Sequence, residues 1–533
     1  MTPCPVVVAT DLADDGLELL RQAADVSLKQ ARPGESSLRQ QLESAEGLIV
    51  RSDVQVDAEL LEHAPRLRVI GLAGTGVGNI DVDTATRRGI IVTSTPGTSA
   101  IAAGEHTLAL LLALGRNLVA AHNSLQAGYW PLQRARQAGV QLAGKTIGII
   151  GYGRVGRVVA ERCLSFGMQV LVHDPYIAED QPGDRRLQPV GLDDLLGRSD
   201  FVSLHVPLTD ETRQMLDAAA IERIRPGARL INTAHGAVWD EHAVADALRS
   251  GQLAGVATDV FPQEPPSGSP LIGLDTVLHT PRIGDNTREA NLNLSTQIVA
   301  QVLDALRGHD YRHVVNMPFL PGTPWAEARP YMRLADCMGR ILHALARQPV
   351  RRVAVEYRGE RLDDLIKPLT VALLHGILKP VLGDQVNYIN APVLASVRGL
   401  QVMQTRGLST GDYASLVSCH FTLEGGEEIT MGGTLLDGRE PRIVQINEYD
   451  INFVPLGQLL IMGSRDQPGV IGRVGTLLAD NDVNIASWQT GRASPGGNTL
   501  TVLTLDQPLT EEQLQVLQAL EFVRHARQLE IRL

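Results

Sequence analysis

Residues 146–156, with the sequence TIGIIGYGRVG, decide the fold of the chain around them. Thr146–Ile150 has the apolar run of a buried strand, and the turn Gly151-Tyr152-Gly153-Arg154-Val155-Gly156 follows it directly. We expect a helix over Arg157–Phe166 and another strand over Gln169–His173. The glycine pattern alone is weak, but a strand, a GxGxxG turn and a helix in this order predict a dinucleotide-binding unit.

The chemistry of this turn favours NAD. Its glycines let the backbone approach a pyrophosphate, which lies at the positive end of the helix dipole. Asp174 ends the next strand, where its carboxylate would accept hydrogen bonds from ribose hydroxyls and repel the 2′-phosphate of NADP. We therefore expect NAD to be bound by Gly151, Gly153, Arg154, Val155, Gly156 and Asp174.

Strands and helices alternate on both sides of this unit. Downstream strands are expected at 201–205, 230–233, 255–258 and 276–280. Upstream, short apolar strands at 6–9, 47–50, 67–72 and 89–92 are separated by helices at 16–24, 35–45, 58–63 and 82–88. This spacing predicts a second parallel α/β sheet, of the flavodoxin type. A long helix is expected from Ile101 to Gln126.

The alternation stops after Val314, and 318–324 is a proline-rich linker. Residues 329–455 mix helices and strands, and the glycine pairs in 411–438 predict hairpins. Residues 458–533 follow the order strand, helix, strand, strand, helix, strand, which is typical of a ferredoxin-like sandwich.

Composition and charge exclude several classes of function. A net charge of −12 disfavours nucleic acid and anionic membranes as partners. Cys4, Cys163, Cys337 and Cys419 are far apart, without metal-ligand spacing or a disulfide framework. No secretory signal opens the sequence, and the apolar segment Leu108–Leu114 is too short to span a bilayer. We expect a cytoplasmic protein with no membrane partner.

Ordered motifs over nearly the whole chain resemble the long-form D-3-phosphoglycerate dehydrogenases of the D-2-hydroxyacid dehydrogenase superfamily. They include GEHTLALLLALGRN (104–117), LINTAHGAVWDEHAVADAL (230–248) and TPRIGDNTREA (280–290). Residues 376–395 resemble the family's intervening domain, and 465–492 its ACT domain. The resemblance implies a split substrate domain (1–98 and 290–315), an NAD-binding Rossmann domain (99–289), an α+β intervening domain (325–455) and a ferredoxin-like ACT domain (457–533).

The resemblance also implies further binding residues. On the cofactor side these are His205, Pro207, Thr212, Thr233, Ala234, Asp259 and Gly284. Arg51 and the turn Gly74-Thr75-Gly76 are expected to bind the substrate. Leu72 replaces a second substrate-binding arginine of the family, and losing a charge-assisted contact costs roughly 1.5–3 kcal/mol. This replacement disfavours 3-phosphoglycerate and indicates an unphosphorylated or more apolar group near Leu72.

Two catalytic positions are exchanged relative to the family. His235 stands where the family has the arginine of INTARG, and Arg282 stands where it has the histidine of TPHIG. Glu264 stands at the position of the carboxylate that orients the base. An arginine side chain stays protonated near neutrality and cannot act as a general base, whereas a histidine can.

Three hypotheses follow from the exchange. Oxidoreduction of a small 2-hydroxy or 2-oxo acid persists with His235 as acid/base and Arg282 as anchor; or the site binds NAD for redox-neutral chemistry; or the protein is a non-catalytic, regulatory relative. The ACT loop Arg465–Gly472, with Asp466, either binds an amino-acid effector or serves only for assembly. Ser464 stands where serine-inhibited relatives often have asparagine, which makes serine control doubtful. The family resemblance implies a homodimer or homotetramer.

Overall fold

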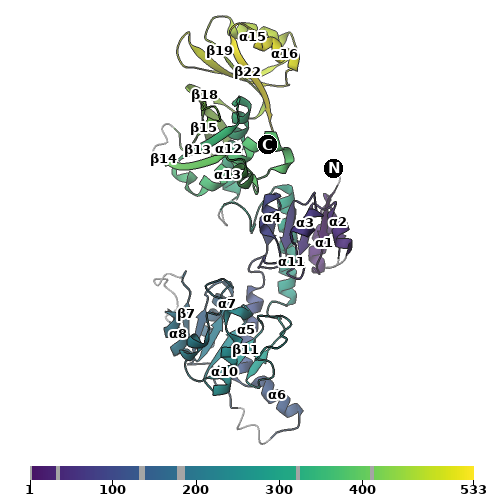
Figure 1. Cartoon of the computed structure of the whole chain (residues 1–533), viewed down its shortest axis with the longest axis vertical. Coiled ribbons are helices and arrows are strands. Elements are labelled where there is room, and N and C mark those ends of the chain that lie inside the picture. Colours follow the sequence, from purple (N-terminus) through teal and green to yellow (C-terminus); the bar gives the residue numbers. More distant parts are fainter. Residues whose placement is uncertain are drawn as a thin grey trace. The chain divides into compact units, whose positions relative to one another are not determined.

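The computed structural model describes residues 3–31, 36–130, 138–176, 186–319, 325–407 and 413–532 (Figure 1). The chain forms two compact units. Unit 1 comprises Met1–Asp11, Leu19–Ser94 and Ile298–Leu533, and unit 2 comprises Leu12–Glu18 and Thr95–Gln297.

The glycine-rich turn belongs to a seven-stranded parallel sheet in unit 2. The strand order is β12-β11-β10-β9-β6-β7-β8, which is the dinucleotide-binding order 3-2-1-4-5-6 with one strand added. The predicted alternation of strands and helices is therefore confirmed. The strands are β6 (Thr146–Ile150), β7 (Gln169–His173), β8 (Leu187–Pro189), β9 (Phe201–Leu204), β10 (Ala228–Asn232), β11 (Leu253–Thr258) and β12 (Val277–His279).

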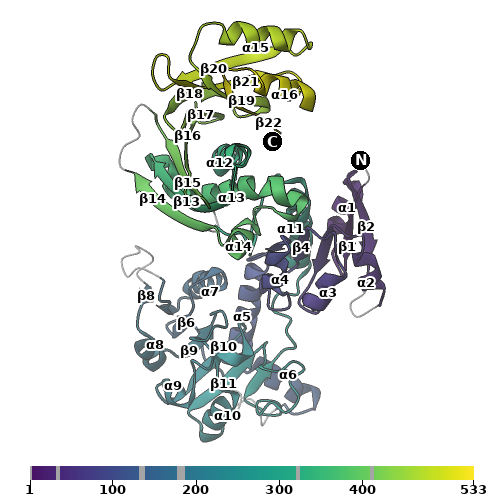
Figure 2. The same cartoon turned by 45° about the horizontal axis from the view of Figure 1, so that its top comes forward.

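Helices cover both faces of this sheet (Figure 2). Successive side chains of a strand point to opposite faces, so Ile149 packs with α5 and α7 while Ile150 packs with α8, α9 and α10. A Cβ at Gly104 of α5 would lie 2.3 Å from Val158 Cγ1 of α7, so glycine permits this close packing. The helices are α5 (Ala100–Gly115), α7 (Arg154–Ser165), α8 (Leu192–Arg198), α9 (Ala218–Glu222) and α10 (Glu241–Ser250).

The prediction of one long helix over 101–126 is wrong. The chain forms α5 and then α6 (Leu118–Gln126), with a bend of 62° between them. Asn117 lies at the break with a φ of 51°, in the left-handed region that asparagine tolerates better than most residues. The apolar run hid this break, because helical periodicity continues on both sides of it.

The N-terminal part of unit 1 is a five-stranded parallel sheet of order β2-β1-β3-β4-β5. This is the flavodoxin order, so the predicted fold class is confirmed. The edge strand β2 was missed because it is only partly buried and carries no continuous apolar run. The elements are β1 (Cys4–Val8), β2 (Val26–Gln30), β3 (Gly47–Val50), β4 (Val69–Leu72) and β5 (Ile91–Ser94), with helices α2 (Ser36–Leu42), α3 (Ala58–Glu62) and α4 (Val82–Arg87). Two further helices, α1 (Asp14–Gln22) and α11 (Arg288–Arg307), each begin in unit 2 and end in unit 1.

A six-stranded mixed sheet follows, of order β14-β13-β15-β16-β17-β18. The predicted hairpins are confirmed as the antiparallel pairs of β15 with β16 and of β16 with β17. Residues 320–324 of the predicted linker lie outside the described residues. The elements are α12 (Trp325–Leu345), β13 (Val350–Arg358), α13 (Ile366–Leu382), α14 (Ala391–Val397), β14 (Gln401–Gly407), β15 (Leu416–Leu423), β16 (Glu428–Leu436), β17 (Glu440–Ile446) and β18 (Tyr449–Phe453).

The C-terminal sheet has the order β20-β21-β19-β22 and the predicted ferredoxin-like succession. Its elements are β19 (Gly457–Arg465), α15 (Val470–Ala479), β20 (Ile485–Arg492), β21 (Asn498–Leu505), α16 (Glu511–Gln518) and β22 (Val523–Ile531).

Among the described residues, the helical segment Leu362–Gln385 and the bent pair α5–α6 are long and apolar enough to cross a membrane. In the former, Leu369 and Leu373 are buried in the core of the mixed sheet, as in the core helix of a folded domain.

Candidate active site and cofactor site

The glycine-rich turn has the geometry that a dinucleotide needs. Gly151 has a φ of +92°, which favours glycine, and a Cβ at Gly156 would lie 2.1 Å from Gly151 O. At Gly153, by contrast, a Cβ would meet no atom within 4 Å, so open space lies beside the backbone where α7 begins. Two glycines therefore close the turn on itself, and the third leaves room for a phosphate at the helix N-terminus.

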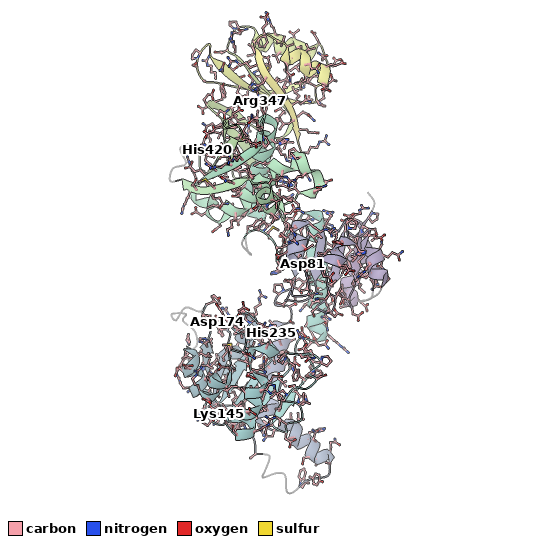
Figure 3. All side chains as sticks on the ribbon, viewed as in Figure 1. Asp81, Lys145, Asp174, His235, Arg347 and His420 are labelled. Atoms are coloured by element: carbon pink, nitrogen blue, oxygen red, sulfur yellow. The ribbon has the colours of Figure 1, made fainter. Side chains whose placement is uncertain are left out.

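Asp174 follows β7 and is tied to the same turn. Its Oδ2 accepts from Tyr152 N at 2.8 Å, and its Oδ1 accepts from Tyr176 N at 2.9 Å. Asp174 and His235 lie toward one end of unit 2, whereas Lys145, just before β6, lies toward the other (Figure 3). This is the expected arrangement, because the carboxyl ends of parallel strands meet at one edge of the sheet.

Three other expected cofactor residues lie beside the turn, after β9. The backbone of His205 lies close to Gly151, and a Cβ placed on Gly151 would be only 2.6 Å from His205 O. Burial lowers the pKa of His205 to about 4, and its Nε2 lies 2.9 Å from Ser203 Oγ. Thr212 Oγ1 donates to Pro207 O at 2.6 Å. These contacts hold the segment after β9 beside the glycine-rich turn at Gly151.

The two exchanged residues and Glu264 lie on loops that follow three neighbouring strands. His235 follows β10, Glu264 follows β11 and Arg282 follows β12. The first two loops pack without a side chain between them, since a Cβ at Gly236 would lie 2.0 Å from Phe261 C. The structure therefore brings together the three residues that the sequence marked as catalytic candidates.

Arg282 and Glu264 form an ion pair. Arg282 Nη1 lies 2.6 Å from Glu264 Oε2, and the two side chains are 60% and 32% exposed. Arg282 has a φ of 54°, and its backbone N–H donates to Asp259 O at 3.0 Å. Arg282 therefore has a carboxylate beside its guanidinium, and Nη1 is engaged by that carboxylate.

His235 lies beside this pair and is an exposed residue whose imidazole is still partly desolvated by its neighbours. That desolvation lowers its pKa, the positive charge of Arg282 lowers it further, and Glu264 partly opposes both effects. Asn232 holds the loop, because its Nδ2 donates to His235 O at 2.9 Å and its Oδ1 accepts from Ala234 N at 3.0 Å. Near neutral pH the ring is therefore uncharged and able to accept a proton.

Asp259 connects these loops. Burial opposes its ionisation, but hydrogen bonds from His106, Thr280 and the N–H groups of Ile283 and Gly284 outweigh that penalty, so its pKa lies below the ordinary value. Its Oδ2 accepts from Gly284 N at 2.8 Å, and its Oδ1 accepts from Ile283 N at 2.9 Å. Asp259 and Gly284 are expected at the cofactor from the sequence, whereas His106 is not, because its one signal is its place in GEHT.

The residues expected to bind substrate lie in unit 1. Arg51 follows β3, and Gly74-Thr75-Gly76 follows β4. Asn79 joins the two loops, since its Nδ2 donates to Arg51 O at 3.0 Å and to Val54 O at 2.6 Å.

The interpretation of Leu72 as a neighbour of an apolar substrate group is wrong. Its side chain is 1% exposed and packs in the sheet core with Val50 and Val92. Leu72 therefore affects substrate binding only through the absence of the arginine that the family has at this position.

The loop after β19 carries the expected effector residue. Asp466 Oδ2 accepts from Gly496 N at 3.0 Å and lies 3.5 Å from Arg492 Nη1. Ser464 is buried and shares a 2.8 Å hydrogen bond with Thr499 Oγ1, so its hydroxyl is used inside the sheet.

Three families match successive parts of the chain. Residues 108–284 match the "D-isomer specific 2-hydroxyacid dehydrogenase, NAD binding domain", 327–447 the "D-3-phosphoglycerate dehydrogenase intervening domain" and 458–522 the "ACT domain". The D-3-phosphoglycerate dehydrogenase of Archaeoglobus fulgidus is 36% identical over 99% of this chain and 100% of its own length. The chain belongs to the D-3-phosphoglycerate dehydrogenase family.

Other members and structural neighbours agree with this assignment. The family's enzyme from Methanocaldococcus jannaschii is 36% identical over 96% of both chains. The TT0316 protein of Thermus thermophilus is 36% identical with a TM-score of 0.54, over 58% of this chain and 99% of its own. D-lactate dehydrogenase of Aquifex aeolicus, complexed with NAD and lactic acid, is 30% identical with a TM-score of 0.51, over 57% of this chain and 96% of its own. The family consists of NAD-dependent D-2-hydroxyacid dehydrogenases, and the cofactor is NAD.

Proposed function

We propose that this protein is an NAD-dependent oxidoreductase of small 2-hydroxy or 2-oxo acids in which the two exchanged residues have exchanged roles. The observation that carries the proposal is the position of His235, with a lowered pKa, on the loop beside the Arg282–Glu264 ion pair. A base that is neutral at physiological pH and a cation thus remain available at the same end of the sheet.

In this proposal, His235 accepts the proton of the substrate hydroxyl during oxidation and returns it during reduction. NAD, when bound, supplies the hydride acceptor. Arg282 donates hydrogen bonds to the carboxylate of the acid, while Glu264 engages its Nη1 and orients the guanidinium. Asp174 and the turn at Gly153 would hold the cofactor.

The substrate class follows from unit 1 together with the relatives. Arg51 and the N–H groups of Gly74-Thr75-Gly76 would bind an acid group. The relatives' name implies 3-phosphoglycerate, but Leu72 removes one cation from this set. We therefore propose that unphosphorylated acids are better substrates than 3-phosphoglycerate.

We also propose that the chain assembles with itself. Helix α6 exposes Leu118, Val119 and Leu125, at 60%, 44% and 54%, and buries none of its side chains. This helix supports a homodimer or homotetramer, because several large apolar side chains exposed on one helix are typical of a protein–protein interface.

The C-terminal sheet and the cysteines support two smaller proposals. An amino-acid effector would bind the loop at Asp466, and its binding would raise the unfolding temperature of the protein but not of Asp466→Ala.

The cysteines are free, and burial raises the pKa of Cys163 and Cys337 to about 12, as suits a reducing compartment such as the cytoplasm.

The test of the main proposal follows NADH absorbance with a panel of 2-oxo acids, including hydroxypyruvate and 3-phosphohydroxypyruvate. Turnover on at least one acid is expected, with His235→Ala slower by about 100- to 10,000-fold. His242→Ala, on α10, is the matched control and should keep the native rate. Native rates that are highest on 3-phosphohydroxypyruvate would refute the inference from Leu72, and an undiminished His235→Ala would refute the acid/base role.

A further inference from the structure

Helix α5 carries two consecutive side chains that contact two different active-site loops. His106 Nε2 lies 3.0 Å from Thr280 Oγ1, and Thr280 is two residues before Arg282. Thr107 Oγ1 lies 2.7 Å from Thr233 Oγ1, and Thr233 is two residues before His235. Each member of the exchanged pair is thus two residues from a contact with the same helix.

The first of these chains of hydrogen bonds has a defined direction. Thr280 donates its hydroxyl hydrogen to Asp259 Oδ1 at 2.5 Å, so its oxygen accepts from His106 Nε2–H. Asp259 in turn accepts from the N–H groups of Ile283 and Gly284. His106 Nε2 also lies 3.4 Å from Asp259 Oδ1. The path therefore runs from α5 to Asp259, both directly and through Thr280, and on to the backbone that follows Arg282.

The second chain is shorter and also directed. Thr107 donates to Ala103 O at 2.8 Å within α5, so Thr233 must donate to Thr107. Thr107 is fully buried, and the close contact of Gly104 with Val158 fixes α5 against α7, the helix that begins at the glycine-rich turn. Helix α5 therefore connects the His235 loop and the Arg282 loop to the glycine-rich turn, because it contacts both loops and packs against α7.

We propose that His106 and Thr107 are positioning residues, His106 for the Arg282 loop and Thr107 for the His235 loop. The kinetic part of this proposal rests on the proposed function, since it assigns substrate anchoring to one loop and proton transfer to the other. His106 then governs binding of the acid, and Thr107 governs the proton-transfer step. A displacement of about 1 Å at a reacting group can cost about 100-fold in rate.

The experiment compares a disrupting and a conservative variant at each position. His106→Leu is expected to raise KM for the acid by about 10- to 100-fold with a smaller change in kcat, and His106→Gln, which keeps an N–H donor, to recover most of the loss. Thr107→Val is expected to lower kcat by about 10- to 100-fold with KM nearly unchanged, and Thr107→Ser to recover it. Thr296→Val removes a similar helical hydroxyl, which bonds Leu292 O on α11, and should change neither constant.

Amide hydrogen exchange tests the same positioning roles without requiring catalytic activity, because it reports how firmly each loop is held. His106→Leu should speed exchange at 282–284 and leave 234–236 as in the native protein, and Thr107→Val should do the reverse. If the native protein turns over no acid, the proposed function fails while these exchange patterns still decide the positioning roles. The proposal would be overturned if His106→Leu and Thr107→Val changed the exchange of both loops equally, or changed neither loop. It would also be overturned if both variants changed kcat and KM together and His106→Gln and Thr107→Ser did not restore them.

Discussion

At the level of single residues, the proposed chemistry depends on which side chain can release and regain a proton. The sequence identified the exchange of His235 and Arg282 and excluded arginine as a base. The family position of Glu264 predicts a charge-assisted pair with Arg282, and the ion pair confirms it. The sequence could not show that His235 lies beside both, because this depends on loops that meet only in the folded sheet. It also could not show that Leu72 is buried, since a residue at the end of a strand faces either the core or a site.

The pH dependence tests the state of His235. Oxidation needs the neutral ring, and the lowered pKa means that kcat/KM for the hydroxy acid stays level above pH 7 and falls only below the ordinary histidine value of about 6.5. Reduction needs the protonated ring, so its rate falls as pH rises through the same pKa. Profiles of both reactions check this, and an oxidation profile that climbs above about pH 7.5 would contradict it.

Glu264→Gln provides the control for this prediction. Glu264 raises the pKa of His235, so its neutralisation should move the inflection of both profiles to lower pH. The Arg282–Glu264 pair is largely exposed, and such pairs contribute about 0–1 kcal/mol, so little loss of folding stability is expected.

At the scale of elements, the sequence predicted the βαβ unit well, because strand, turn and helix are adjacent in the chain and β6 and β7 have the predicted bounds. It missed the break at Asn117, where helical periodicity continues through a left-handed residue, and it missed β2, a partly exposed edge strand. The contacts of α5 with Thr233 and Thr280 were also invisible, because they join segments more than 120 residues apart.

The glycine-rich turn gives a prediction that separates fold from binding. Gly156→Ala should prevent NAD binding and lower the unfolding temperature, because its Cβ would lie 2.1 Å from Gly151 O. Gly153→Ala should weaken NAD binding and leave the unfolding temperature within about 2 °C of native, because its Cβ meets no protein atom within 4 Å. Thermal unfolding and NADH fluorescence titration measure the two effects. Equal destabilisation by both variants would contradict this account of the turn.

At the level of the whole molecule, the sequence predicted the succession of α/β, mixed and ferredoxin-like parts, because the strand–helix alternation stops after Val314 and a different order of elements begins at Gln458. The division into two compact units, with residues 12–18 grouped with 95–297, could not be predicted, since it depends on long-range packing. The predicted boundaries between domains remain predictions. Net charge argued against nucleic acid as a partner but gave no information on self-association.

The exposed apolar face of α6 predicts assembly. The native protein should be a dimer or tetramer by light scattering, and the double variant Leu118→Asp/Leu125→Asp should dissociate. Burying such a side chain is worth about 1.5–3 kcal/mol, so the loss of two weakens the dimer by more than about 100-fold. Val397→Asp, at a residue 76% exposed on α14, is the control and should leave the mass unchanged. An unchanged mass in the α6 variant would show that α6 is not the interface.

The exchange of roles between His235 and Arg282 is tested most directly by reversing it. The measurement is the rate of NADH oxidation with the best 2-oxo acid, in the native protein and in the double variant His235→Arg/Arg282→His. We expect the native protein to turn over and each single variant to be slower by about 100-fold or more. A native protein that is inert on every acid, beside a double variant that turns over, would contradict the exchange of roles.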